Sequence, residues 1–186
     1  MGGTAEGGNF GGPWGRAPWP QVHGRALGDE VALFLSTYVN KVDRKGRVSV
    51  PATFRASLSG QSFQGIVAFR SFKYPTLDAS GIDRMEDMTA RLDRLDEFSE
   101  ERDNLSWLFA DAQQLPFDPE GRIILPERLV EHAFITESAA FVGLGRTFQI
   151  WEPGRFEEHQ AAQRERARRE GARLPPIAGG LERRPE

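Results

Sequence analysis

The sequence predicts an α+β fold that is built twice along one chain, and three observations carry this prediction. The phrase Asp-x-x-Gly-Arg, followed by strand-like residues and then proline, occurs in NKVDRKGRVSVP at 40–51 and again in LPFDPEGRIILP at 115–126. The same offset of 75 residues matches apolar residues outside the motif, for example Phe54 with Leu129. Short segments of strand character surround both copies, and segments with apolar residues at helical spacing separate them. Matches that stay in register over such a length indicate a duplicated structural unit.

Composition places the chain among soluble proteins of ordinary size. Its 186 residues are enough for one domain or for two small halves with a shared core. Apolar residues make up 39% and charged residues 27%. The longest apolar run, VALFL, falls far short of the ~20 residues that cross a bilayer. The N-terminus lacks the features of a signal peptide, and the chain has no cysteine for disulfides. We therefore expect a cytoplasmic protein with no membrane partner.

The N-terminal part of the sequence predicts an extension followed by a first repeat. Residues 1–30 are rich in glycine, with scattered proline and tryptophan and no period, so we expect them to be disordered. Order should begin near Val31, and residues 31–80 should form the first repeat. Its expected elements are strands over Leu33–Val42 and Val48–Val50, a helix that Pro51 opens, and strands over Gly65–Phe72 and Tyr74–Leu77.

Residues 81–111 predict connecting helices. Apolar residues recur there at spacings of three and four, which is the period of a buried helix face. They are Met85, Met88, Leu92 and Leu95. The carboxylates of this region fall mostly on the opposite side, which favours a solvated surface over a catalytic pair. A second helix is expected after Ser99, because serine is a good N-cap residue.

The order of expected elements in the first repeat recurs in residues 112–152, which we interpret as the second repeat. After a lead-in at 112–117, the expected elements are a strand over Arg122–Leu125, a helix that Pro126 opens, and strands over 139–144 and 147–151. Residues 153–186 should form a charged helix over 155–171 and a frayed tail. Glutamates interleave with the arginines of this helix, so we expect it to be solvated. These arginines are Arg164, Arg166, Arg168 and Arg169.

Charge distinguishes the two copies of the motif. Residues 40–55 carry five cations against one carboxylate, a balance of +4. Residues 111–128 carry four carboxylates against two arginines, a balance of −2, and the connecting stretch 78–103 carries ten against four, a balance of −6. The whole chain has a net charge of only −3. A nucleic-acid partner would therefore have to be bound by a local patch.

The aspartate and glycine of the motif have a turn role that needs no ligand. Asp43 and Asp118 can accept a hydrogen bond from the backbone two residues further on, and Gly46 and Gly121 supply the positive φ that ends such a turn. No backbone requirement selects the arginine that follows each glycine. The second of these, Arg122, has acidic neighbours, so we expect it to stabilise the fold by pairing with Asp118 or with a carboxylate of another chain.

The first hairpin tip predicts a nucleic-acid site. Four cations crowd this tip: Lys41, Arg44, Lys45 and Arg47. Like charges oppose each other at such a tip unless an anionic partner is present. We therefore predict that these residues bind double-stranded DNA through phosphates and base edges. A tip that is merely solvated is the alternative.

These residues also carry a family resemblance. The duplicated motif, the opening FLSTYVNKVDRKGRVSVPATFR and the strand FQIW at 148–151 resemble the MraZ family. The likeness runs from residue 31 to the region of residue 160. It implies two tandem swapped-hairpin units of the AbrB/SpoVT type, β-barrels that form a pseudo-dimer, with added helices between and after the repeats.

The same resemblance implies a function. A member of this family is expected to be a nucleoid-associated regulator that represses its own operon of division and cell-wall genes. It is expected to bind repeated promoter motifs as a ring-shaped homo-oligomer, without a cofactor or a small-molecule substrate. The family motif falls on Asp43, Gly46 and Arg47, and again on Asp118, Gly121 and Arg122. The DNA role maps onto the first copy.

Two features depart from the family pattern. Pro119 and Glu120 make the second tip acidic, so we do not expect that tip to contact DNA. Residues 1–30 have no counterpart in the family, and we hypothesise that translation starts at Val31. An intact mass of the native protein that includes residues 2–30 would contradict this hypothesis.

Other functional classes receive less support from the sequence. His23, His132 and His159 have no metal-ligand spacing, and neither a nucleophile elbow nor a phosphate-binding loop is present, so an enzyme is not expected. The main alternative is an antitoxin-like module that binds a protein through a swapped hairpin. In that case the acidic 83–110 region and the C-terminal arginines would engage the partner protein.

Overall fold

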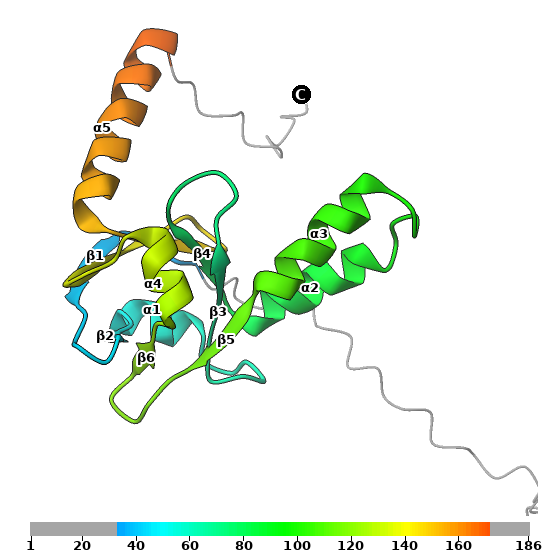
Figure 1. Ribbon diagram of the computed structural model, residues 1–186, viewed down its shortest axis with the longest axis horizontal. Helices are drawn as coiled ribbons and strands as arrows, with labels where there is room; N and C mark the ends of the chain where they lie inside the picture. Colours follow the sequence, from blue (N-terminus) through cyan, green and yellow to red (C-terminus); the bar gives the residue numbers. More distant parts are fainter. Residues whose placement is uncertain (1–32, 172–186) are drawn as a thin grey trace, which may run out of the picture. The chain divides into compact units, whose positions relative to one another are not determined.

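The computed structural model describes residues 33–171, and these residues form an α+β fold (Figure 1). The expectations for residues 1–30 and for the tail after Gly171 lie outside the described part. The elements, in chain order, are β1 (Thr37–Lys41), β2 (Arg47–Ser49), α1 (Ala52–Ser57), β3 (Gly65–Arg70), β4 (Leu77–Ser80), α2 (Ile82–Leu92), α3 (Glu100–Asp111), β5 (Gln113–Pro116), β6 (Arg122–Ile124), α4 (Glu127–Ala133), β7 (Ser138–Gly143), β8 (Phe148–Trp151) and α5 (Pro153–Glu170).

The strands form two antiparallel sheets. Six of them make one sheet in the order β1-β7-β8-β4-β3-β5, and β2 pairs with β6 in a second sheet of two strands. Four strand pairs join one repeat to the other: β1 with β7, β3 with β5, β4 with β8 and β2 with β6. The pairs β3–β4 and β7–β8 stay within a repeat. The two repeats are therefore halves of one structure.

The expected β-barrel units are not present as closed barrels in residues 33–171, so that part of the prediction is wrong. The six-stranded sheet is open, with β1 and β5 at its edges. The first hairpin separates after a single bridge between Val42 and Val48, because β2 then pairs with β6 and not with β1.

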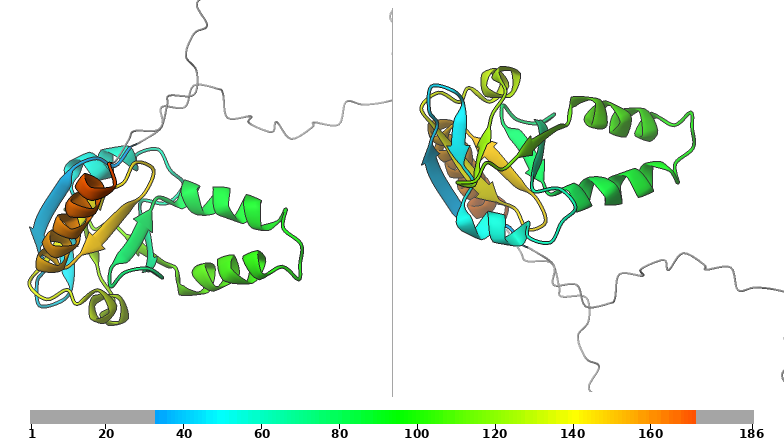
Figure 2. Two further views of the ribbon diagram at one scale, coloured as in Figure 1. Left: turned by 90° about the horizontal axis from the view of Figure 1, so that it is seen from above. Right: turned by 90° about the horizontal axis from the view of Figure 1, so that it is seen from below.

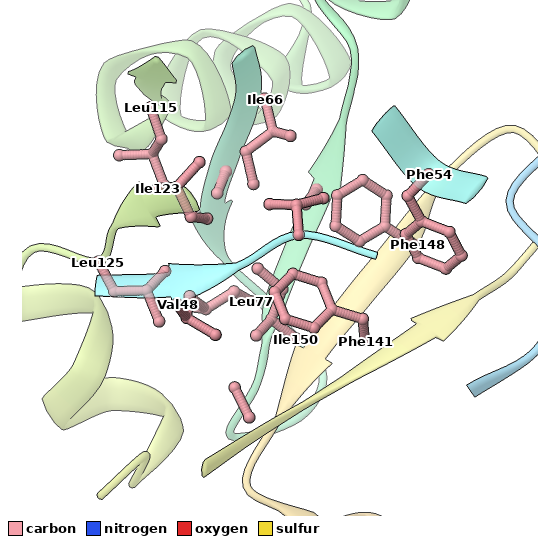
Figure 3. Close-up of a cluster of buried hydrophobic side chains, with 14 of the residues drawn as sticks. Val48, Phe54, Ile66, Leu77, Leu115, Ile123, Leu125, Phe141, Phe148 and Ile150 are labelled. Carbon is pink, nitrogen blue, oxygen red and sulfur yellow. The ribbon is translucent and has the colours of Figure 1, made fainter. Parts of the chain in front are cut away.

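One core lies between the two sheets and the short helices (Figure 3). Val48 and Ile123 reach it from β2 and β6, at 0% and 1% exposure. Phe54 on α1 and Leu129 on α4, which the repeat offset matches, are equally buried at 1% and 0%. Burial of each such side chain contributes about 1.5–3 kcal/mol to folding. Because both repeats fill the same core, neither can bury its apolar face alone.

Two expected strands have different bounds in the structure. The first begins at Thr37 because Ser36 has a positive φ of 72°, and Phe34 makes only an isolated bridge to Gly145. The short strand expected at Tyr74–Leu77 lies at Leu77–Ser80. Residues before it form the turn from β3, in which the backbone N–H of Thr76 bonds the carbonyl of Tyr74 at 2.8 Å.

The helices agree well with the helical periodicity. The region 81–111 contains α2 and α3, and the Ser99 hydroxyl caps α3 by accepting from the N–H of Arg102 at 3.2 Å. Of the expected apolar face on α2, Met85 is buried while Met88 is only half-buried. In α5 no residue is buried, as the interleaved charges predict. Among the described helices, none has the length and apolar character to cross a membrane.

Candidate nucleic-acid interface

The carboxylate of Asp43 organises the first hairpin tip. Its Oδ1 accepts hydrogen bonds from the N–H groups of Lys45 and Arg47, both at 2.9 Å. The carbonyl of Asp43 accepts from Gly46 N–H at 2.9 Å, which closes the turn. Gly46 has a φ of 75°, the left-handed conformation that glycine adopts without strain. The turn is therefore fixed by two residues of the motif.

The second tip has the same geometry. Asp118 Oδ1 accepts from the N–H groups of Glu120 and Arg122 at 3.0 and 2.9 Å. Gly121 also has a φ of 75°, and its N–H bonds the Asp118 carbonyl at 2.9 Å. Two segments with different residues at the tip thus adopt one hydrogen-bonding pattern. The backbone alone does not distinguish them.

The structure gives both arginines of the motif a structural partner. The pairing of Arg122 with Asp118 that the sequence predicts is present, and the corresponding pair of Arg47 with Asp43 was not expected. Arg47 Nε donates to Asp43 Oδ2 at 2.6 Å, and Arg122 Nε donates to Asp118 Oδ2 at 2.7 Å. Each aspartate therefore binds its arginine through one oxygen and the turn backbone through the other. The signal in the sequence was the constant spacing of four residues between the aspartate and the arginine.

The tips differ in what surrounds the arginine. Arg122 forms a second ion pair, with Glu120 through Nη2. In the first tip the position of Glu120 is taken by Lys45, and Arg44 precedes it. Within residues 33–171, the exposed side chains of Lys41, Arg44 and Lys45 make no hydrogen bond or ion pair. The first tip therefore carries uncompensated positive charge, and the second does not.

The strands β2 and β6, which follow the first and the second tip, pair into one two-stranded ribbon that carries both tips. Arg47 lies opposite Ile124, and Ser49 lies opposite Arg122. These four residues alternate with the buried Val48 and Ile123, so they occupy the outer face of the ribbon. Since the strands are antiparallel and each arginine begins its strand, the arginines lie at opposite ends of that face.

Backbone hydrogen bonds connect each tip to the far end of the other strand. Gly46 carbonyl oxygen accepts from Leu125 N–H at 2.9 Å, and Gly121 carbonyl oxygen accepts from Val50 N–H at 3.1 Å. Arg55 on α1 lies against Gly121 and donates from Nε to the Val50 carbonyl at 3.2 Å. The tips are thus held on a two-stranded ribbon whose other face is the core.

Hydrogen bonding shifts the pKa values of the tip carboxylates. The backbone N–H of Arg47, and further its side chain and the N–H of Lys45, lower the pKa of Asp43. The pKa of Asp118 is lowered in the same way, mainly by the backbone N–H of Arg122. The pKa of Arg122 is raised, first by its hydrogen bond to Asp118. Both aspartates are therefore held as anions, which keeps the arginines in place.

The described residues hold no group of three or more histidine, cysteine or acidic side chains that could bind a metal. His132 lies on α4, and His159 lies on α5, where its ring stacks on Trp151 at 4.9 Å between centroids. His23 is outside the described part. The described arginines of α5 include Arg166, which pairs with Glu170 at 3.0 Å, and Arg168, which lies 3.9 Å from Glu165. These pairs fit a solvated helix.

Comparison with known proteins identifies relatives along most of the chain. A family model described as "MraZ protein, putative antitoxin-like" matches residues 108–174. The protein named transcriptional regulator MraZ from Pelagibacter ubique is 46% identical over 136 residues, which cover 73% of this chain and 88% of that protein. The protein of the same name from Rickettsia akari is 48% identical over 128 residues, covering 68% of this chain and 86% of that protein. The one from Rickettsia rickettsii is 48% identical over 134 residues, covering 71% and 90%.

Proposed function

The chain belongs to the MraZ family, and from this premise we propose that it is a sequence-specific DNA-binding transcriptional regulator that represses its own operon. The observation that carries the proposal is the uncompensated cationic tip, built on the same backbone turn as an acidic one. Its relatives bear the name transcriptional regulator. A protein with this role works in the cytoplasm, on the DNA of the nucleoid.

The cations of the first tip have two separate roles in DNA binding. Asp43 holds Arg47 by Nε, so the two Nη groups of the guanidinium remain to donate to a base edge or a phosphate. Arginine held in a fixed orientation suits bidentate recognition of guanine in the major groove. Lys41, Arg44 and Lys45 supply phosphate contacts, which position the ribbon and make the affinity depend on salt.

The second tip supports the ribbon and leaves DNA contact to the first. Its arginine is bound by two carboxylates, Asp118 and Glu120, and further negative charge there opposes the approach of phosphate. We interpret the exchange of strands between the repeats as a swapped-hairpin pseudo-dimer of the AbrB type. In this interpretation the shared turn geometry maintains the fold, and the tip charges decide which half binds DNA.

A single tip provides modest affinity, so several must act together. A ring-shaped homo-oligomer presents one cationic tip per chain to repeated motifs along a promoter. After the first tip binds, the next contacts are intramolecular and need no further encounter. The repeat spacing of the operator should then match the spacing of the tips.

One observation favours a second candidate, a protein-binding module of the antitoxin type. The α2–α3 region is acidic and exposes large apolar side chains, among them Phe98 at 91% and Trp107 at 71%. Such side chains commonly mark protein contacts. Capture of a partner on the immobilised chain without DNA, lost on Trp107→Ala, would favour this alternative.

Footprinting on the DNA upstream of the gene tests the proposed function. We expect protection of short repeated sequences that weakens steeply as salt is raised. Arg47→Ala should abolish the protection at moderate salt, whereas Arg166→Ala on α5 should leave it unchanged. Equal protection by the Arg47→Ala chain would rule out the first tip as the DNA site. No protection by the unaltered chain would contradict the function itself.

A further inference from the structure

The helices α2 and α3 form a hairpin that is fastened at both ends. At the sheet end, Asp111 binds Arg70 of β3 at 2.7 Å and also pairs with Arg128 of α4. At the far end, Arg102 Nη1 donates to the Leu92 carbonyl at 2.9 Å. Figure 2 shows the two helices running side by side away from the sheet. The spacing of the helices is therefore set by contacts at their ends.

A pocket of about 360 Å³ lies between these fastened ends. We call it the hairpin pocket. Its lining residues are Arg84, Met88, Arg91, Arg94, Leu95, Glu101 and Leu105. Three of them are arginines and three are apolar side chains that are half-buried. A volume of this size is within the range of small-molecule sites, which combine apolar walls with a few charged groups.

The arginines of the hairpin pocket have no partner within the described residues. Arg84, Arg91 and Arg94 make no side-chain hydrogen bond or ion pair there, in contrast to Arg70 and Arg102, which are both engaged. Three guanidinium groups around one pocket repel each other, and an anion between them removes that repulsion. Arginine is also the residue best suited to bind carboxylate or phosphate oxygens.

Positive charge outweighs negative charge among the residues that line the hairpin pocket. Of the hairpin's carboxylates, only Glu101 is among the residues that line the pocket. Other carboxylates, such as Asp87 and Asp93, adjoin lining residues in the chain without lining the pocket, and they reduce the net attraction for an anion. The three arginines and the single carboxylate of the lining still favour an anion over a cation.

We propose that the hairpin pocket binds an organic anion, with a carboxylate or phosphate on an apolar group. The charged group is held by the three arginines. The apolar group lies on Met88, Leu95 and Leu105, which are half-buried and leave room between the helices. This inference does not rest on DNA binding, because none of the tip cations lines the pocket. Its failure would leave the proposed function intact.

Titration with a fluorescent organic anion tests the proposal on the full chain. The probe is anilinonaphthalene sulfonate, which joins a sulfonate to apolar rings, and the matched neutral probe is phenylnaphthylamine, which lacks the sulfonate. The test variant is Arg84→Gln with Arg91→Gln. The control variant is Arg164→Gln with Arg169→Gln, which removes the same charge from exposed positions of α5. Circular dichroism checks that each variant is folded.

We expect saturable binding of one sulfonate probe per chain. Loss of two charge-assisted contacts should weaken it by about tenfold or more in the test variant, with no change in the control variant. The neutral probe should bind both variants equally. Glu101→Gln removes the one carboxylate of the pocket and should tighten binding by several-fold, an effect that a purely structural role of the helix would not produce.

Three results would overturn the proposal. One is the absence of saturable binding by the unaltered chain. Another is equal affinity of the test and control variants for the sulfonate probe, with Glu101→Gln also unchanged. The third is binding of the sulfonate probe only when the protein is diluted. An acidic segment of a second copy would then fill the pocket at higher protein concentration.

Discussion

At the scale of single residues, the aspartate of each motif makes more than one contact. Asp43 binds two backbone N–H groups with one oxygen and Arg47 with the other, and Asp118 repeats this arrangement with Arg122. The carboxylate therefore shapes the turn and orients the arginine at the same time. A change at either aspartate should affect the turn and the orientation together.

Acid should weaken the fold through these aspartates. The pKa of Asp118 is lowered in the folded protein, so its contribution to stability is complete above its unfolded pKa of about 3.9. That contribution is lost as the pH falls through the lower folded pKa. Asp118→Asn should reduce the melting temperature at neutral pH and flatten its decline between about pH 5 and pH 2. Thermal unfolding across this range, with Asp87→Asn on the exposed side of α2 as control, measures both effects.

Replacement of the two motif arginines should separate binding from stability. Arg47→Ala removes the base-edge or phosphate contact that we propose and should weaken promoter binding by about 1–3 kcal/mol per tip, or roughly fivefold to 150-fold. Arg122→Ala breaks two ion pairs within the fold and should lower the melting temperature more than the affinity. Binding by fluorescence anisotropy and unfolding by circular dichroism on both variants measure these effects. Equal loss of affinity in both would contradict the division of roles.

The sequence showed the charge of the two tips more fully than their side-chain contacts. The uneven charge of the tips was visible in the order of residues, because lysine and arginine stand where the second copy has proline and glutamate. The pairing of Arg47 with Asp43 was not foreseen. The equivalent pair of Arg122 with Asp118 was expected from the acidic surroundings of Arg122. The cations around Arg47 pointed instead to an anionic partner outside the chain.

At the scale of elements, the β2–β6 ribbon depends on close backbone approach. A Cβ on Gly46 would lie 2.8 Å from the carbonyl oxygen of Leu125, the residue after β6, and Gly46 has a φ of 75°. Gly145, with a φ of 84°, has nothing within 4 Å of the same position. The two glycines therefore share the conformation and differ in the space around them.

Alanine at these glycines should separate strain from steric clash. Gly145→Ala should cost about 1 kcal/mol for the left-handed backbone alone. Gly46→Ala should cost about 2 kcal/mol or more, because the methyl group also displaces the partner strand. Urea denaturation of both variants measures the difference. Equal destabilisation would mean that the ribbon adjusts freely around the first tip.

The types of the elements followed from periodicity, while their bounds depended on local contacts. Helices with a clear apolar face, and the strands that follow the two motifs, lie where the sequence indicates. β4 lies further along the chain because the turn before it includes Pro75, which has no N–H for a ladder, and Thr76, whose hydroxyl bonds the Ile150 carbonyl at 2.7 Å. That long-range bond is not readable from neighbouring residues.

At the scale of the whole described fold, the two repeats share one core. Leu115 and Ile123 of the second repeat lie in the same cluster as Val48 and Ile66 of the first. Residues 33–171 should therefore unfold in one cooperative transition, with equal calorimetric and van't Hoff enthalpies. Calorimetry checks this on the chain at a protein concentration too low for it to associate. Two separate transitions would mean that each repeat has a core of its own.

The exchange of strands between the repeats could not be derived from the repeat itself. A duplicated sequence is equally compatible with two separate units and with one unit made of exchanged strands. The choice depends on whether β2 pairs with β1 or with β6, and both pairings satisfy the same alternation of apolar residues. From the residues alone, the pairing of β2 with β6 could not be distinguished from the pairing of β2 with β1.

Conversion of one tip into the other tests the central claim most directly. Arg44→Pro with Lys45→Glu gives the first tip the Asp-Pro-Glu-Gly-Arg sequence of the second, whose turn has the same hydrogen bonds. The fold should be retained, as measured by circular dichroism. Affinity for the upstream DNA in an anisotropy titration should fall by about a hundredfold or more, with a shallower dependence on salt, because each tip loses two cations that we propose to bind phosphate. Unchanged affinity in a folded variant would contradict the assignment of DNA binding to the cationic tip.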